Sequence, residues 1–240
     1  MEINNRTEEI SNYYDEFSKE QIKTGINLRH YYLFDKLKYF GLVKNSSVLE
    51  IGCGIGTLSE LIVKHVTQGR IVLTDISKEN ISIAKERLSK FKNVSYHVTD
   101  MMTFISKQTF DFIVLADVIE HIPLEQQPVL FENLSKLVHS NSVIFINIPH
   151  PKIIEYYKKN DPSKLQIIDQ AINAGQMMTI AEPFGFRLHS YQSYKLFHNQ
   201  NDYVMIVFHL DQEVKYERRE KIEIIVAKWK IKLKNILNLI

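Results

Sequence analysis

Residues 48–60 read VLEIGCGIGTLSE, and this stretch decides the fold. An apolar run leads into three alternating glycines, Gly52, Gly54 and Gly56, and a helix-like run leads out of them. Glycine weakens both strands and helices, so the cluster indicates a strand-to-helix turn whose backbone a ligand approaches closely. A tight turn without a ligand is the alternative. Glu50 places a carboxylate just ahead of the glycines, and its charge bears on what the turn contacts.

Strand-like and helix-like segments alternate from residue 47 onward. The hydrophobic pattern predicts strands at 47–51, 70–74, 94–98, 110–116 and 143–148, and helices at 58–65, 80–88, 102–107 and 126–139. Apolar runs such as FDFIVLA indicate strands buried on both faces, as in a parallel sheet between helix layers. Beyond them we expect a helical block over 152–181, interrupted near 161, and two closing strands, GFRLHSYQS and DYVMIVFHL. The expected fold is a doubly wound, mostly parallel α/β sheet with helices on both faces.

The composition of the whole chain narrows its class. The 240 residues are 45% hydrophobic and suffice for one α/β domain with a large core. A formal net charge of +2 gives no reason to expect a nucleic-acid partner. Cys53 is the only cysteine, so we expect no internal disulfide and a cytoplasmic location. We find no stretch typical of a signal peptide or of a membrane span.

Acidic residues follow the predicted strands, at the sheet edge where such folds bind ligands. Asp75 suits the ribose hydroxyls of a nucleotide, or else it caps the helix that begins near Ser77. Asp100 suits an adenine amino group with Met101 packed on the base, the alternative being a loop aspartate and a core methionine. Glu50 would repel the pyrophosphate of a dinucleotide and attract a cation. The charges therefore favour S-adenosylmethionine (SAM), which carries a sulfonium and an ammonium.

Together these motifs resemble those of class I SAM-dependent methyltransferases. The residues that carry the resemblance are VLEIGCGIG (48–56), TDIS (74–77), the Asp100 turn and FDFIVLADVIEHIP (110–123). The family implies a Rossmann-like sheet of seven strands, the last one antiparallel, which DYVMIVFHL would supply. On this basis we expect a helical cap over 1–45, a methyltransferase domain over 46–210 with a substrate lid at 149–181, and an amphipathic helix over 211–240.

The resemblance also implies a cofactor site. Gly52 and Gly54 would lie against the methionine moiety of SAM, and the helical cap would cover it, with Arg29 pairing with the methionine carboxylate. The expected cofactor-binding residues are Tyr14, Arg29, Glu50, Gly52, Cys53, Gly54, Asp75, Ile76, Asp100, Met101, Ala116, Asp117 and His121.

Two histidines that follow strands are candidate general bases. An alcohol acceptor gains from a base in the transition state, whereas an amine needs only to be neutral. His121 in DVIEHIP and His150 in NIPHP both lie at the ligand edge, and histidine has a pKa near neutrality. A helix-end and a loop histidine with structural roles are the alternatives. No spacing of His, Cys and acidic residues predicts a metal site.

The methyl acceptor is expected to be a small molecule or glycan. The lid contains Tyr156, Tyr157, Lys158, Lys159 and Gln166, and aromatic faces beside polar groups suit a sugar. The pattern is similar to sugar methyltransferases of polysaccharide biosynthesis, which favours a hydroxyl acceptor. Alternatives are N- or C-methylation of an amino sugar or a quinone-like molecule, and a non-catalytic SAM-binding scaffold.

Residues 211–240 depart from the domain pattern. Apolar residues at helical spacing share one face, with lysines on its flanks: Ile222, Ile225, Val226, Trp229, Leu233, Ile236, Leu237 and Ile240. Three interpretations compete. The helix packs on its own domain or on a second subunit of a homodimer, it lies on the inner face of an anionic membrane, or it docks a partner protein.

Overall fold

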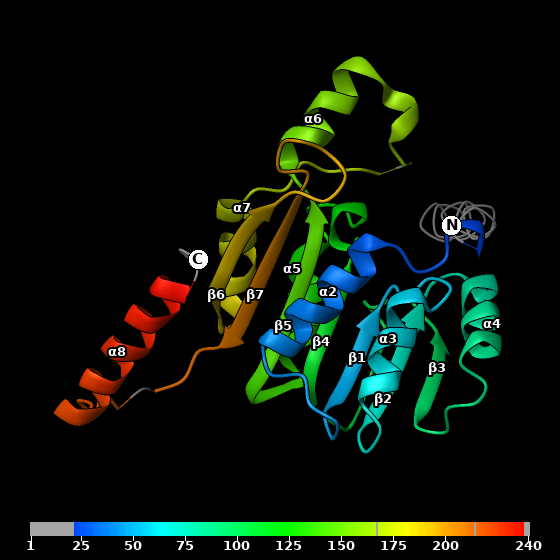
Figure 1. Ribbon diagram of the computed structural model, residues 1–240. Helices are drawn as coiled ribbons and strands as arrows, with labels where there is room; N and C mark the ends of the chain where they lie inside the picture. The colour runs from blue at the N-terminus through cyan, green and yellow to red at the C-terminus, as the bar shows by residue number, and fades with distance from the viewer. Residues whose placement is uncertain (1–21, 167, 214, 238–240) are drawn as a thin grey trace.

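A computed structural model describes residues 22–166, 168–213 and 215–237. Its core is a seven-stranded sheet of order β3-β2-β1-β4-β5-β7-β6 (Figure 1). The strands are β1 (Ser47–Ile51), β2 (Arg70–Asp75), β3 (Val94–Val98), β4 (Phe110–Ala116), β5 (Val138–Pro149), β6 (Phe186–Tyr194) and β7 (Tyr203–Leu210). The first five run parallel, and β7 runs antiparallel to both β5 and β6. The predicted doubly wound sheet and its antiparallel last strand are confirmed.

Helices cover both faces of the sheet and divide the core in two. The helices are α2 (Leu28–Tyr39), α3 (Thr57–His65), α4 (Lys78–Arg87), α5 (Gln127–Ser135), α6 (Pro151–Asn160), α7 (Ala174–Ala181) and α8 (Lys221–Leu237), with short 3-10 turns η1 (Ile119–His121), η2 (Pro162–Lys164) and η3 (Glu182–Phe184). Leu33 of α2, Ile62 of α3 and Ala84 of α4 share one buried cluster, while Phe131 of α5 and Met177 of α7 belong to the other. The strands between them are therefore buried on both faces, as their apolar runs predicted.

Two predicted helices differ in the structure. The segment 102–107 is a turn followed by irregular chain, because Asp100 Oδ1 accepts the Met102 N–H at 2.9 Å and so favours a local turn over a helix. The helix predicted over 126–139 ends at Ser135, and Val138 instead begins β5 opposite Phe110. Hydrogen bonding between strands outweighs the helical pattern at that point.

The block after β5 and the chain ends also refine the sequence analysis. The helix predicted over 152–181 is α6 and α7, separated by η2 and by irregular chain that begins at residue 165. Residues 1–21 of the predicted cap over 1–45, Tyr14 among them, lie outside the described residues, whereas α2 begins at a capping box in which Asn27 and His30 exchange hydrogen bonds. Of the C-terminal helix predicted over 211–240, the structure shows α8 over Lys221–Leu237, and residues 211–213 and 215–220 before it are not helical.

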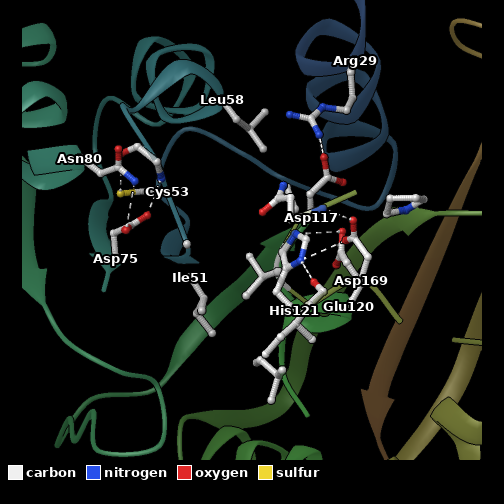
Figure 2. A pocket seen from close by; sticks show the side chains of 18 of the residues that line it. Arg29, Ile51, Cys53, Leu58, Asp75, Asn80, Asp117, Glu120, His121 and Asp169 are labelled. Atoms are coloured by element: carbon white, nitrogen blue, oxygen red, sulfur yellow. Dashed lines mark hydrogen bonds and ion pairs between the residues drawn. The ribbon is translucent and has the colours of Figure 1, made fainter. Parts of the chain in front are cut away.

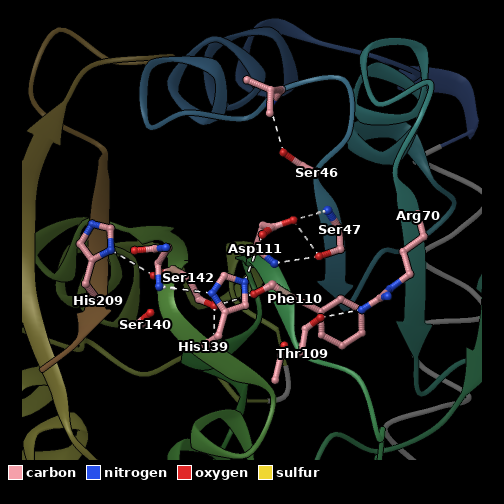
Figure 3. A network of polar contacts seen from close by, with 12 residues as sticks. Ser46, Ser47, Arg70, Thr109, Phe110, Asp111, His139, Ser140, Ser142 and His209 are labelled. Atoms are coloured by element: carbon pink, nitrogen blue, oxygen red, sulfur yellow. Dashed lines mark hydrogen bonds and ion pairs between the residues drawn. The ribbon is translucent and has the colours of Figure 1, made fainter. Parts of the chain in front are cut away.

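The amino ends of β1, β4 and β5 are joined by a polar network (Figure 3). Asp111 Oδ2 accepts hydrogen bonds from the Ser47 N–H at 2.6 Å and from the Ser47 hydroxyl at 2.8 Å, and His139 Nε2 lies 3.1 Å from Asp111 Oδ1. The Ser142 hydroxyl donates to the Phe110 carbonyl at 2.6 Å. This network fixes the register of the strands at the end of the sheet opposite the ligand edge.

Candidate functional site

The ligand edge opens into a cavity of about 860 Å³. It lies at the carboxyl ends of β1, β2, β4 and β5, where doubly wound sheets bind their ligands. Twelve of the thirteen expected cofactor residues line it: Arg29, Glu50, Gly52, Cys53, Gly54, Asp75, Ile76, Asp100, Met101, Ala116, Asp117 and His121. The remaining one, Tyr14, lies outside the described residues. The fold therefore brings residues from separate segments of the chain to one place.

Two different physical requirements explain the glycines of the β1–α3 turn. Gly52, Gly54 and Gly56 all have positive φ, at 65°, 53° and 78°, a region that other residues seldom adopt. A Cβ on Gly52 would lie 2.5 Å from Cγ2 of Val118, at the cavity wall. A Cβ on Gly56 would instead press on Ala84, inside the fold. Gly52 and Gly54 thus line the cavity, and Gly56 lets α3 pack against α4.

Asp75 anchors the glycine turn to the second strand. Its Oδ2 accepts the Gly54 N–H at 2.8 Å, and its Oδ1 accepts the Ser77 N–H at 2.9 Å and an Asn80 amide N–H at 3.2 Å. The N-cap of α4 is Ser77 rather than Asp75, because the Ser77 hydroxyl accepts the Asn80 N–H. The capping role weighed for Asp75 is therefore wrong.

Glu50 is a buried carboxyl at the cavity. Burial raises its pKa to about 8, although a 2.6 Å hydrogen bond from the Ser59 hydroxyl opposes the shift, and Asp75 adds to it through like charge. At neutral pH the group is mainly protonated. A cation placed in the cavity would favour the ionised form, so Glu50 couples ligand charge to its own proton.

A strained aspartate lies above the centre of the sheet. Asp117 has a φ of 57° and is the only described non-glycine residue with positive φ. Asn147 fixes this conformation, since its carbonyl accepts the Asp117 N–H at 2.8 Å and its side-chain amide donates to Asp117 Oδ1 at 3.0 Å. Arg29 forms an ion pair with Asp117 (Figure 2), so α2 is tied to the end of β4. Backbone strain held by such partners is typical of functional sites.

Next to Asp117, and across the cavity from Cys53 and Asp75, two acidic residues flank His121 (Figure 2). His121 Nδ1 lies 2.5 Å from the carbonyl oxygen of Ile168 and 3.2 Å from Asp169 Oδ1, and its Nε2 lies 3.8 Å from Glu120 Oε1. Burial lowers the pKa of His121, but Glu120, Asp169 and the Ile168 carbonyl outweigh it and raise the pKa to about 9.

Glu120 is 1% exposed, and neither of its carboxylate oxygens accepts a hydrogen bond within the described part of the chain. Burial raises its pKa to about 7 against the attraction of His121.

The second candidate base lies elsewhere. His150 is the N-cap of α6, where its Nδ1 accepts the Lys152 N–H at 3.2 Å, and it is absent from the described cavity lining. Burial and the charge of Lys152 lower its pKa. Of the two histidines, the geometry therefore favours His121 as the residue beside an acceptor. In the described ranges, no cluster of three or more His, Cys, Asp or Glu side chains is arranged to hold a metal ion.

Comparison with known proteins identifies the family. A family described as "Methyltransferase domain" matches residues 26–194, about 70% of the chain. The chain belongs to this methyltransferase family. The resemblance stated from the motifs is thereby confirmed.

Curated relatives are matched over part of their length. Malonyl-[acyl-carrier protein] O-methyltransferase 1 of Ilyobacter polytropus is 32% identical over 109 residues, which are 45% of this chain and 40% of that protein. Ubiquinone biosynthesis O-methyltransferase of Pelagibacter ubique is 33% identical over 105 residues, 43% of this chain and 42% of that protein. This chain thus spans about two fifths of the length of these relatives.

Solved structures share the fold at low sequence identity. Magnesium protoporphyrin IX methyltransferase from Synechocystis PCC 6803 with bound SAH (S-adenosyl-L-homocysteine) aligns with a TM-score of 0.66 and 15% identity, over 85% of this chain and 99% of that one. The N-methyltransferase NodS from Bradyrhizobium japonicum WM9 in complex with S-adenosyl-L-homocysteine (SAH) aligns with a TM-score of 0.62 and 20% identity, over 77% and 86%.

The residues of this methyltransferase fit its cofactor, SAM. A Cβ on Gly52 would overlap the Val118 side chain, and both residues line the cavity, so the bare backbone of Gly52 forms part of the cavity wall. Glu50 offers a carboxyl that a positively charged ligand would ionise. Cys53, by contrast, is buried with its pKa raised by burial and nearby carboxylates, so its thiol stays protonated. Its N–H donates to the Thr74 carbonyl at 3.0 Å and ties the turn to β2.

Some residues that line the cavity, among them His30 and Asp169, were not predicted from the sequence. His30 accepts the Asn27 N–H on Nδ1 at 3.0 Å, so Nε2 carries the proton and donates to the Thr57 hydroxyl at 2.9 Å. Burial, Arg29 and Arg87 lower the pKa of His30 to about 4, which keeps it neutral. The NxxH spacing of the capping box was the available signal. Asp169 carried no such signal, because only the fold brings the lid beside His121.

The lid contributes a subset of its predicted residues. Tyr157 and Gln166 line the cavity, whereas Tyr156, Lys158 and Lys159 are exposed and do not. Tyr157 Oη lies 3.3 Å from Nε2 of His198, which follows β6, so the lid contacts the loop that closes the sheet.

Proposed function

We propose that this methyltransferase transfers the methyl group of SAM to a hydroxyl of a small molecule, with a sugar or glycan as the acceptor class. The observation that carries the proposal is the Glu120–His121 pair, which lies in the same cavity as the glycine turn. The volume of about 860 Å³ is in the upper part of the ~300–1,000 Å³ range of ligand pockets, which leaves room for cofactor and acceptor together.

In this proposal the glycine turn and Asp75 hold the cofactor, Asp75 at the ribose, while Asp100 and Met101 border the adenine. Arg29, freed from Asp117, pairs with the methionine carboxylate. Bound SAM supplies an activated methyl group on a sulfonium. Alignment of acceptor and methyl group by the walls of the cavity contributes much of the rate.

The Glu120–His121 pair takes the acceptor's proton. With pKa values of about 7 and 9, the pair holds one proton between these limits and can accept a second one. A hydroxyl beside the pair passes its proton to the ionised Glu120 carboxylate, which lies next to the protonated His121, as the hydroxyl oxygen becomes methylated. A base with a conjugate acid near neutral pH suits this step.

The chemistry of the site and the names of the relatives support the proposed acceptor class. An alcohol benefits from a base, and the two curated relatives above are named O-methyltransferases. The cavity lining includes the aromatic residues Tyr157 and Phe197 and the polar residues Lys164 and Gln166, a combination that suits a sugar. N-methylation of an amino sugar is the second candidate, favoured by the likeness to the N-methyltransferase NodS.

A screen for SAH release tests the proposal. Purified protein with SAM would be offered nucleotide sugars, oligosaccharides, phenols and amino sugars, and product mass would locate the methyl group. We expect turnover with a hydroxyl acceptor and loss of turnover in His121→Ala at nearly unchanged SAM affinity. Turnover with amines alone would favour the second candidate. SAH binding without turnover on any acceptor would favour the scaffold.

A further inference from the structure

Helix α8 exposes an apolar surface that the domain does not cover. It follows the irregular segments 211–213 and 215–220 and stands apart from the sheet in Figure 1. Trp229 is 59% exposed and Leu233 56%, and the exposed apolar side chains of the helix also include Ile222, Ile224, Ile225, Val226, Ile231 and Ile236. A surface helix of a globular protein normally buries such a stripe. The interpretation that α8 packs on its own domain is therefore not supported.

The apolar side chains and the lysines of α8 are arranged in bands. At about 100° per residue, one face holds Ile222, Ile225, Val226, Trp229, Leu233 and Ile236. Lysines flank this face on both edges, with Lys221, Lys228 and Lys232 on one side and Lys230 and Lys234 on the other. Lys232 Nζ lies 5.2 Å from the Trp229 ring, as this arrangement requires. Ile224 and Ile231 project from the opposite side of the helix.

Charge is segregated between the helix and the rest of the chain. Residues 218–237 contain seven Lys or Arg and two Glu, a net charge of +5, whereas the whole chain carries +2. The remaining residues therefore carry a net charge of −3. An anionic surface attracts the helix and repels the domain.

We propose that α8 binds the surface of a lipid bilayer rich in anionic headgroups. An interfacial helix buries its apolar face at the acyl boundary while flanking lysines extend to the headgroups, and α8 has both features. Binding lies in the plane of the surface, since no described helix is long and apolar enough to cross a membrane.

Two other partners match these bands less well. A second copy of the helix would bring the lysine edges of both copies together, with Glu223 as the only acidic residue of α8 to offset them. A nucleic acid would use the lysines and leave the apolar face exposed.

Vesicle sedimentation of the full chain tests this proposal with a matched pair of variants. Leu233→Glu places a charge on the apolar face, and Ile231→Glu places the same charge on the opposite face. We expect at least ~10-fold stronger binding to phosphatidylcholine vesicles containing phosphatidylglycerol than to pure phosphatidylcholine. Leu233→Glu should lower binding ~50-fold, and Ile231→Glu at most ~5-fold.

Other outcomes overturn the proposal. Equal binding of both variants would show that the apolar face is not used. A concentration-dependent dimer in analytical ultracentrifugation that Leu233→Glu dissociates, without vesicle binding, would assign the face to a second copy. RNA binding without vesicle binding would assign the lysines to a nucleic acid. As controls, both variants should keep the wild-type melting temperature and SAH affinity, which would show that the domain is intact. The vesicle-binding result then does not depend on the proposed methyl transfer.

Discussion

Carboxyl groups at the two ends of the sheet have pKa values that are shifted in opposite directions. At the amino end, burial would raise the pKa of Asp111, but hydrogen bonds from Ser47 and the contact with His139 outweigh it and lower the pKa. At the carboxyl end, Glu50 and Glu120 are fully buried with raised pKa values, and neither oxygen of Glu120 accepts a hydrogen bond in the described part of the chain.

This difference in pairing indicates that the carboxylate at the amino end serves stability and those at the carboxyl end serve function. A paired carboxylate stabilises the folded chain, whereas a buried and poorly paired one costs stability and persists where a ligand or a proton supplies the missing partner. The comparison predicts that neutral substitutions at the two ends have opposite effects on stability, and that only those at the carboxyl end impair function.

The largest effect is expected at the backbone of the cavity. Gly52→Ala places a Cβ against Cγ2 of the stiff Val118 side chain at positive φ, which we expect to cost roughly 2–4 kcal/mol of unfolding free energy and to weaken SAH binding about 100-fold or more. Gly41→Ala is the control, because Gly41 also has positive φ but a Cβ there would have no atom within 4 Å. This variant should lose only the unfolding free energy that the strained backbone costs. Urea unfolding and calorimetry measure both quantities. Wild-type SAH affinity in Gly52→Ala would contradict the assignment of the turn.

Glu120→Gln is expected to separate chemistry from binding. The variant keeps the shape of the side chain but cannot share a proton with His121, so turnover should fall about 100-fold at unchanged SAH affinity. In the wild type, turnover should rise with pH through about 7, as Glu120 loses its proton, and this midpoint should be absent from the variant. A variant that retained the wild-type pH profile would remove Glu120 from the proton-accepting pair.

Glu50→Gln should stabilise the protein and weaken cofactor binding. The pKa of Glu50 rises from 4.5 to about 8, so between these values the native state holds a proton that the unfolded state has lost, and stability falls as pH rises. At pH 8 the variant should be more stable by roughly 2–4 kcal/mol, while SAM affinity falls about 10-fold. Calorimetry in two buffers should detect proton release on SAM binding by the wild type alone. A destabilised variant would contradict the pKa of Glu50.

The smallest effect is expected at the amino end. Asp111→Asn removes the charge that Ser47 and His139 stabilise, and because the site is partly exposed we expect a loss of about 1 kcal/mol. The lowered pKa means that this stabilisation is present at neutral pH and is lost as pH falls through the acid range. SAH affinity should not change. A stabilised Asp111→Asn protein would end the contrast between the two ends.

The residues proposed to bind the cofactor could be singled out in the sequence because their signals are local. Gly52 and Gly54 reveal a positive-φ turn, and Asp75 follows its strand directly, so sequence order alone places them at one edge. The mostly parallel sheet and its antiparallel last strand were predicted from the apolar runs and from the family resemblance.

The acceptor side was harder to predict because it is assembled from distant segments. Asp169 reaches His121 only through the path of the lid, and the pKa of Glu120 depends on burial that no short motif encodes. His150 was misleading for a similar reason, since its position after a strand does not reveal that its ring caps α6.

A crystal structure with bound SAH is the strongest test of the proposal that the glycine turn and Asp75 bind the cofactor. We expect the methionine moiety along Gly52 and Gly54 and the ribose hydroxyls beside Asp75, with the sulfur facing His121. SAH bound elsewhere, or a nicotinamide dinucleotide occupying the glycine turn in its place, would contradict it.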